Sequence, residues 1–472
     1  MSGGLRHGFV FLTLGQVVFI LTGYATHIFL ARSLGPAAYG TYGVLLSVLS
    51  TVCLVLTTGI PEAIAKFAAE KPLEAGGIFA RGIALQFRFS LLLAVGYALL
   101  SPIIARALHD PSLTLELCIT ALAVPSVALY AVVLGALNGQ HRFFAQALVV
   151  GGYGAARALL IIGLSPAFHI WGAVIGFVVA PLIAIVFSLP SILKNRSVSE
   201  LDSRAIWLFA RPVIAFTLAL AFLMNLDLFI VKSLISDPDL IGFYAAAGTI
   251  AKVPYFFFSA LGVVLLPIVS SAAGEVGGQV LGAVRNAIRL TFAVALGVAA
   301  VAVPLAPAVL ELLYGQRYTA SALPLSLLIV ANTFYTLTFI VSYALNGLGK
   351  PALAMRLGVI GLVIQAVAAL LLTRLFGPVG AASASCAGGA LVLSALVLAS
   401  RPHLGAIFPL RSLLRVALSG SLVVIVGLVL PHRHAAALLC SVPLALGYVM
   451  LLILSGEMSL SELASWVRRT PA

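Results

Sequence analysis

Residues 29–42 read FLARSLGPAAYGTY, and residues 229–244 read FIVKSLISDPDLIGFY. The two stretches align at an offset of 200 for Phe29, Arg32, Ser33 and Leu34 with Phe229, Lys232, Ser233 and Leu234. Two additional residues in the second stretch then match Gly40 and Tyr42 to Gly242 and Tyr244. Each stretch places a cation, a proline and a glycine between long apolar runs. This shared pattern indicates that the chain contains an internal repeat.

Two further matches extend the repeat. Ala136-Leu137-Asn138-Gly139 recurs as Ala344-Leu345-Asn346-Gly347, at an offset of 208. At the same offset, Phe168, Gly172 and Ala173 match Phe376, Gly380 and Ala381. Three matches in one order, with an offset that changes only from 200 to 208, predict two copies of one bundle.

The composition is that of a membrane protein. The 472 residues are 62% hydrophobic and only 9% charged, with a mean hydropathy of +1.17. A soluble domain is about 45–50% apolar and about 25% charged, so this chain has too few charges to cover a soluble surface. Because segments in hydrocarbon must satisfy their own backbone polar groups, helices are expected throughout. We predict an all-α polytopic membrane protein.

Apolar runs long enough to cross a bilayer occur fourteen times. We predict an N-lobe at residues 1–196 with spans 1–6 and a C-lobe at 197–403 with spans 7–12. Residues 404–456 are expected to form spans 13 and 14, outside the repeat. The cytoplasmic tail, 457–472, forms either an interfacial helix or a frayed end. Because six is an even number, both six-helix bundles enter the membrane in the same direction, as parallel repeats.

Loop cations predict the orientation. With fourteen spans, 18 Lys and Arg residues lie on the side of both termini and 6 lie on the opposite side. Cytoplasmic loops carry the excess of Lys and Arg, so both termini are predicted to be cytoplasmic in the cell (inner) membrane. The same distribution accounts for most of the net charge of +13, and no nucleic-acid partner is expected.

The chain resembles a known family. The carrying motifs are LARSLGPAAYGTYG after span 1, LNG before span 5, Asp227 in span 7 and GFY before span 8. They resemble the polysaccharide-biosynthesis flippases, the O-antigen type exporters within the multidrug/oligosaccharidyl-lipid/polysaccharide exporter superfamily. The resemblance covers essentially the whole chain. It implies a V-shaped pair of lobes around a cavity, and transfer of a polyprenyl-pyrophosphate-linked oligosaccharide from the cytoplasmic to the outer leaflet.

Charged side chains inside spans are the best candidates for function, because each costs about 2.5–3.5 kcal/mol at the bilayer centre. A cationic cavity lined by Arg88, Arg157 and Lys252 would bind a lipid pyrophosphate. Arg88 also lies near enough to the interface for its side chain to extend into the headgroups. Two polar neighbours complete the predicted set, Gln86 for a sugar hydroxyl and Arg211 at the cytoplasmic mouth.

Asp227 and Lys252 are predicted to lie at similar depth in neighbouring antiparallel helices. They would form either a structural ion pair or one that opens when substrate phosphate binds Lys252. In the second case Asp227 takes up H+ or Na+. His27 is the repeat counterpart of Asp227, and we expect the two to face each other across the cleft. A packed, neutral His27 is the alternative.

Other chemistry is not indicated. The four cysteines, Cys53, Cys118, Cys386 and Cys440, lie in apolar stretches without metal-ligand spacing, and no cofactor or metal is expected. Nucleotide and hydrolase motifs were not found, so an enzyme is not predicted. The rivals are a cation-coupled multidrug exporter, a peptidoglycan-precursor flippase and a membrane scaffold. Expected partners are the lipid-linked oligosaccharide, membrane lipids and polysaccharide-assembly proteins.

Overall fold

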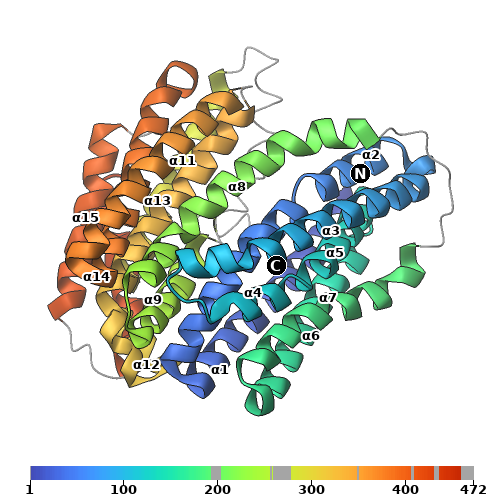
Figure 1. The fold of residues 1–472 in the computed structure, drawn as a ribbon. Helices are drawn as coiled ribbons and strands as arrows, with labels where there is room; N and C mark the ends of the chain where they lie inside the picture. The colour runs from blue at the N-terminus through green and yellow to red at the C-terminus, as the bar shows by residue number, and fades with distance from the viewer. Residues whose placement is uncertain are drawn as a thin grey trace. The chain divides into compact units, whose positions relative to one another are not determined.

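A computed structural model describes residues 2–192, 203–255, 258, 278–347, 350–405, 409–429 and 435–458. All regular secondary structure in these ranges is helical, which confirms the predicted class (Figure 1). The helices of the first half are α1 (Ser2–Thr57), α2 (Ile60–Glu70), α3 (Ala75–Ala107), α4 (Leu113–Thr120), α5 (Ala123–Gly139), α6 (Phe143–Phe168) and α7 (Ile170–Ile192). Those of the second half are α8 (Ser203–Leu234), α9 (Pro238–Ala251), α11 (Gly278–Ala302), α12 (Ala306–Tyr314), α13 (Ala322–Gly347), α14 (Pro351–Leu404), α15 (Leu410–Val429) and α16 (Ser441–Leu454).

Ten stretches of the described chain are long and apolar enough to cross a membrane. Leu14–Ala68 and Ala352–Pro402 contain 55 and 51 residues, about twice the length that one span needs. Each therefore holds two spans, and the ten stretches account for all predicted spans except the seventh and eighth. Those two correspond to α8 and to α9, whose predicted span continues into residues outside the described ranges. The prediction of a polytopic protein with about fourteen spans is confirmed.

A glycine followed by a proline breaks each of the two longest helices. Gly35 in α1 has φ 77° and ψ 173°, and Gly377 in α14 has φ 60° and ψ −143°. Glycine adopts positive φ without the steric cost that a side chain adds. Pro36 and Pro378 then begin the next helix, where their missing N–H needs no partner. The quoted stretch 29–42 is therefore the turn between two spans, as its sequence predicts.

The chain folds as two compact units, the first of which contains Met1–Asn225 and Lys232–Gly242. In this unit α6 packs against α1 and α7, while α2 and α3 pack against α5 (Figure 1). Its largest described core cluster joins α2, α3 and α5 to the beginning of α8. The fully buried members of this cluster include Ile60, Ile64, Ile78, Val132, Leu137, Ile206 and Ala210.

The second unit contains Leu226–Val231 and Phe243–Ala472. In it α13 packs against α14 and α11 (Figure 1). The two helices outside the repeat, α15 and α16, also pack against α11. The Tyr448 hydroxyl of α16 donates a hydrogen bond to the Ala293 carbonyl of α11 at 2.7 Å. A Cβ at Gly297 would lie 2.4 Å from the Tyr448 ring, so the ring needs glycine there. The helices α15 and α16, which correspond to predicted spans 13 and 14, are thus attached to α11, which corresponds to predicted span 9.

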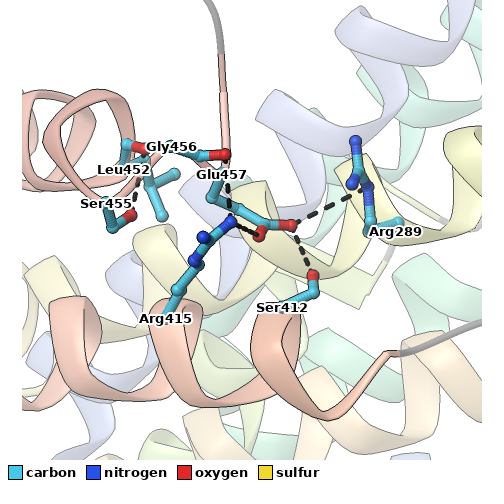
Figure 2. Close-up of polar contacts among 7 residues, drawn as sticks. All are labelled: Arg289, Ser412, Arg415, Leu452, Ser455, Gly456 and Glu457. Atoms are coloured by element: carbon cyan, nitrogen blue, oxygen red, sulfur yellow. Dashed lines mark hydrogen bonds and ion pairs between the residues drawn. The ribbon is translucent and has the colours of Figure 1, made fainter.

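A buried carboxylate strengthens this attachment, as Figure 2 shows. The Glu457 side chain is 3% exposed, and its oxygens lie 3.7 Å from Arg289 Nε and 3.9 Å from Arg415 Nη1. The Ser412 hydroxyl donates a hydrogen bond to the same carboxylate, and Arg415 also donates to the Gly456 carbonyl at 3.1 Å. Residues from α11, α15 and the segment after α16 therefore meet at one acid.

The structure repeats itself at the positions that the sequence matches. A Cβ at Gly172 would lie 2.6 Å from the Leu164 carbonyl oxygen, and one at Gly380 would lie 1.9 Å from that of Leu372. These pairs are related by the offset of 208. The Arg142 N–H bonds the Leu137 carbonyl and the Lys350 N–H bonds the Leu345 carbonyl, each at 2.9 Å and again at this offset. The two pseudo-symmetric six-helix bundles are therefore present.

The predicted lobe boundaries, 1–196, 197–403, 404–456 and 457–472, remain predictions. The compact units follow packing rather than the repeat, because Lys232–Gly242 belongs to the first unit. The tail beyond residue 458, where an interfacial helix or a frayed end is predicted, lies outside the described residues.

Candidate functional site

The predicted site residues fall into two groups, one in each unit. His27, Gln86, Arg88, Arg157 and Arg211 belong to the first unit, and Asp227 and Lys252 belong to the second.

Asp227 of α8 is a buried carboxylate with 8% of its surface exposed. Its Oδ2 accepts a hydrogen bond from the Tyr244 hydroxyl of α9 at 2.7 Å, and its Oδ1 accepts one from the Leu228 N–H at 2.8 Å. Tyr244 is itself only 1% exposed. The short connection between α8 and α9 brings these two side chains together. The anion is therefore held by donors although it lies inside a predicted span.

Three uncharged polar residues continue the cluster. The Tyr335 hydroxyl of α13 lies 2.9 Å from Gln365 Oε1 and 3.1 Å from the Ser385 carbonyl oxygen, both in α14. Gln365 Nε2 lies 3.4 Å from the Ser385 hydroxyl, which is within hydrogen-bonding reach of Asp227. All three side chains are buried. The sequence analysis did not select these three residues because it considered mainly charged side chains inside spans. The signal that could have identified them is an uncharged polar side chain within an apolar run.

Lys252 lies at the end of α9 and interacts electrostatically with Asp227. Both residues belong to the second unit, so the predicted pairing is compatible with its internal packing. The carboxylate's described hydrogen bonds come from Tyr244, Leu228 and Ser385 rather than from the ammonium alone. Whether Lys252 is released on substrate binding stays a prediction.

Arg157 of α6 has an aromatic surrounding in the first unit. Its guanidinium carbon lies 4.9 Å from the ring centroid of Phe19, 5.3 Å from that of Tyr153 and 5.6 Å from that of Phe177. A Cβ at Gly23 would lie 3.1 Å from its Nη2, so α1 approaches the guanidinium closely at a residue without a side chain. Cation–π contacts of this kind contribute about 0.5–2 kcal/mol each. Among the described residues, rings rather than carboxylates surround this cation.

His27 of α1 contacts two tyrosines that follow the Gly35 break. Its Nδ1 lies 3.0 Å from the Tyr39 hydroxyl, and its ring lies 5.8 Å from that of Tyr42. His27 is partly buried, which fits the packed alternative as well as a titrating one. His27 and Asp227 lie in different units, so their facing arrangement across a cleft stays a prediction.

The remaining predicted residues have different surroundings. Gln86 is fully buried, and its Nε2 donates to the Leu56 carbonyl at 2.7 Å, close to the C-terminal end of α1. This gives the side chain a structural contact, and its role toward a sugar stays a prediction. Arg88 is exposed on α3 one turn from Leu92, and Arg211 is exposed on α8. The position of Arg88 on an exposed apolar face agrees with side-chain extension toward headgroups as well as with cavity lining.

The described residues contain no group of three or more His, Cys, Asp and Glu side chains that could hold a metal ion. The charged groups of the candidate site are therefore a buried anion with hydroxyl donors in the second unit and a half-buried cation with aromatic rings in the first.

Comparison with known proteins identifies the family. The family described as polysaccharide biosynthesis protein matches residues 29–323, which is more than half of the chain. The chain belongs to this family. The resemblance seen in the sequence is thereby confirmed. No curated protein matches the chain.

Solved structures show the same fold. The lipid II flippase MurJ, in an inward closed conformation, has a TM-score of 0.76 at 16% identity, over 94% of this chain and 98% of that one. An inward-facing multidrug resistance MATE family transporter of the MOP superfamily has a TM-score of 0.69 at 18% identity, over 85% and 98%. The eukaryotic MATE transporter AtDTX14 has a TM-score of 0.65 at 14% identity, over 88% and 100%. The chain is a multi-pass membrane protein with the fold of these flippases and transporters.

Proposed function

We propose that the protein is a flippase that moves a polyprenyl-pyrophosphate-linked oligosaccharide from the cytoplasmic to the outer leaflet for cell-surface polysaccharide assembly. Transport proceeds by alternating access through a cationic cavity. We place the protein in the cell (inner) membrane with both termini cytoplasmic, and the 18 to 6 distribution of loop cations supports this orientation.

The proposal rests on the Arg157 guanidinium, which lies inside a predicted span among aromatic rings. A guanidinium inside a span is retained because it meets a negative charge or a cavity. The described partners of Arg157 are the rings of Phe19, Tyr153 and Phe177, which leave its charge uncompensated. A pyrophosphate supplies that charge and accepts bidentate hydrogen bonds from the planar guanidinium. Aromatic faces beside the cation also suit a sugar ring, which stacks on such surfaces.

The other predicted residues have supporting roles. Lys252 is a second phosphate ligand in the other unit, while Arg88, Gln86 and Arg211 guide the headgroup from the cytoplasmic side. Asp227 couples transport to H+ or Na+, because a buried carboxylate whose hydrogen bonds come from hydroxyl and amide donors can exchange one of these donors for a cation. His27 takes part in the same coupling. Membrane lipids and polysaccharide-assembly proteins are the expected partners.

The experiment replaces Arg157 by Gln and by Lys in a bacterial strain that lacks its polysaccharide flippase. The matched control is Arg106→Gln, which removes an exposed cation at the end of α3. We expect Arg157→Gln to lose surface polysaccharide, Arg157→Lys to retain part of it, and Arg106→Gln to behave as wild type. Membrane insertion of each variant is checked by immunoblot. Full polysaccharide with Arg157→Gln contradicts the proposal.

A second candidate is a peptidoglycan-precursor flippase, and the observation that favours it is the fold shared with the lipid II flippase MurJ. The same plasmids are introduced into a strain depleted of its lipid II flippase. Rescue of growth there, without rescue of polysaccharide in the first strain, supports the second candidate. Export of cationic dyes without either rescue supports a multidrug exporter.

A further inference from the structure

The segment Lys232–Gly242 lies in the first unit although the sequence repeat assigns it to the second copy. It is the turn between α8 and α9, and its counterpart in the first copy is the turn around Gly35-Pro36. Residues on both sides of it, Leu226–Val231 and from Phe243 onward, belong to the second unit. The tip of this helical hairpin is therefore anchored on the first unit, as is the earlier part of α8, whereas Leu226–Val231 between them belongs to the second unit.

Two glycines related by the repeat provide one anchor. A Cβ at Gly40 would lie 2.7 Å from the Gly242 nitrogen, and one at Gly242 would lie 1.9 Å from the Pro36 carbonyl oxygen. The backbones of the two equivalent turns thus touch at the positions where both copies carry glycine. No side chain fits between them, since real Cβ atoms do not approach so closely. By contrast, Gly248 in the same helix has open space around it.

An ion pair provides the other anchor. Lys232 Nζ lies 2.6 Å from Asp110 Oδ2 in the turn between α3 and α4, and the two side chains are 10% and 28% exposed. The Ser112 hydroxyl donates to the other Asp110 oxygen, which fixes the carboxylate. The acid of this pair has no acidic counterpart in the second copy. At the offset of 208, the turn at 316–320 reads QRYTA and contains no acid.

We propose that Lys232–Asp110, together with the Gly40–Gly242 contact, is the latch of the outer gate. This inference rests on the proposed flippase function, because a substrate that leaves toward the outer leaflet requires the outer turns to separate. Both anchors lie at turns that the loop cations assign to the outer side. While they hold, the tip of the α8–α9 hairpin stays on the first unit; when they break, it moves with the second copy.

The experiment measures the gate directly, without a transport assay. Spin labels are placed at Leu115 and Ser236, which are exposed residues on the two sides of the latch, after the native cysteines are replaced by alanine. Pulsed electron resonance then gives the distance distribution of the purified protein in lipid nanodiscs. We expect Lys232→Met and Asp110→Asn to raise the ratio of long to short distances about two- to tenfold.

Matched variants test whether loss of the two anchors causes the change in the distance distribution. The exchanged pair, Asp110→Lys with Lys232→Asp, should restore the short distance, whereas Lys71→Met, which breaks an exposed ion pair with Glu74, should change nothing. Gly242→Ala should open the gate and Gly248→Ala should not.

An unchanged distribution in both single-charge variants and in Gly242→Ala overturns the latch. Failure of the proposed function is seen separately, as a wild-type protein that rescues no surface polysaccharide. A working flippase with an unchanged distribution therefore refutes the latch alone.

Discussion

The hydrogen bond between Tyr244 and Asp227 should contribute measurably to the stability of the second unit. The hydroxyl and carboxylate oxygens are 2.7 Å apart, and the two residues are 1% and 8% exposed, so water does not screen the contact. A hydrogen bond to a charged group contributes about 1.5–3 kcal/mol in soluble proteins. In membrane proteins, double-mutant cycles average about 0.6 kcal/mol and reach about 1.7. Because this bond is short and its acceptor is charged, we expect a coupling energy of about 1–1.7 kcal/mol.

A double-mutant cycle with Tyr244→Phe and Asp227→Asn tests this value. Unfolding of the purified protein is followed by circular dichroism as SDS replaces a mild detergent, and the coupling energy is the deviation from additivity. A second cycle pairs Asp227→Asn with Tyr335→Phe. The Tyr335 hydroxyl bonds Gln365 and the Ser385 carbonyl, so its coupling to Asp227 should be smaller. Equal couplings in the two cycles, or none in the first, would refute the assignment of Tyr244 as the main donor.

Three further predictions concern other sites. Gly380→Ala places a Cβ 1.9 Å from a backbone oxygen and should destabilise the protein by about 1–3 kcal/mol, whereas Gly358→Ala, with open space, should not lower the melting temperature. Glu457→Gln weakens the attachment of α15 and α16 and should cost about 1–2 kcal/mol in SDS unfolding, since the ion-pair distances of 3.7 and 3.9 Å are long. Burial alone would raise the pKa of Asp110, but the hydrogen bonds from Lys232 and Ser112 together with the charge of Lys232 outweigh this and lower the pKa. The pair therefore stabilises at neutral pH and is lost as pH falls through the lowered pKa, so Asp110→Asn should flatten that acid limb of a melting-temperature profile.

The fold could be predicted from the sequence because its signals are local and repeated. Hydropathy gives the spans, since hydrocarbon leaves few alternatives to a helix. Glycine and proline at 35–36 and 377–378 mark breaks inside long apolar runs, and the structure has its kinks there. The repeat could be read from glycines because each one permits a backbone contact that a side chain would block, as at Gly172 and Gly380.

The site was less accessible to sequence reasoning. Arg157 and Asp227 could be selected because a charge in a span is conspicuous. The polar cluster beside Asp227 could not, because Tyr335, Gln365 and Ser385 lie in α13 and α14, far along the chain from α8, and carry no charge. Lys232 shows the opposite difficulty. Its position at the end of a predicted span suggests a side chain that extends to the lipid headgroups. The structure instead pairs Lys232 with Asp110, an acid 122 residues away in the chain.

The two copies place different chemistry on one scaffold. His27 and Asp227 are repeat counterparts, and so are Tyr42 and Tyr244. Asp227 bonds Tyr244 directly, whereas the longer His27 side chain contacts the Tyr42 ring and bonds Tyr39, three residues earlier. Tyr39 is matched by Ile241 in the second copy, so each copy has its own hydroxyl partner for its own titratable group. If both groups act in coupling, exchanging only the titratable residue, as in His27→Asp, should leave the new carboxylate without its donor. We therefore expect His27→Asp to lose transport, and transport to return only in a variant in which the Tyr42 hydroxyl can bond the new carboxylate. That result would show that the tyrosine is needed together with the titratable residue.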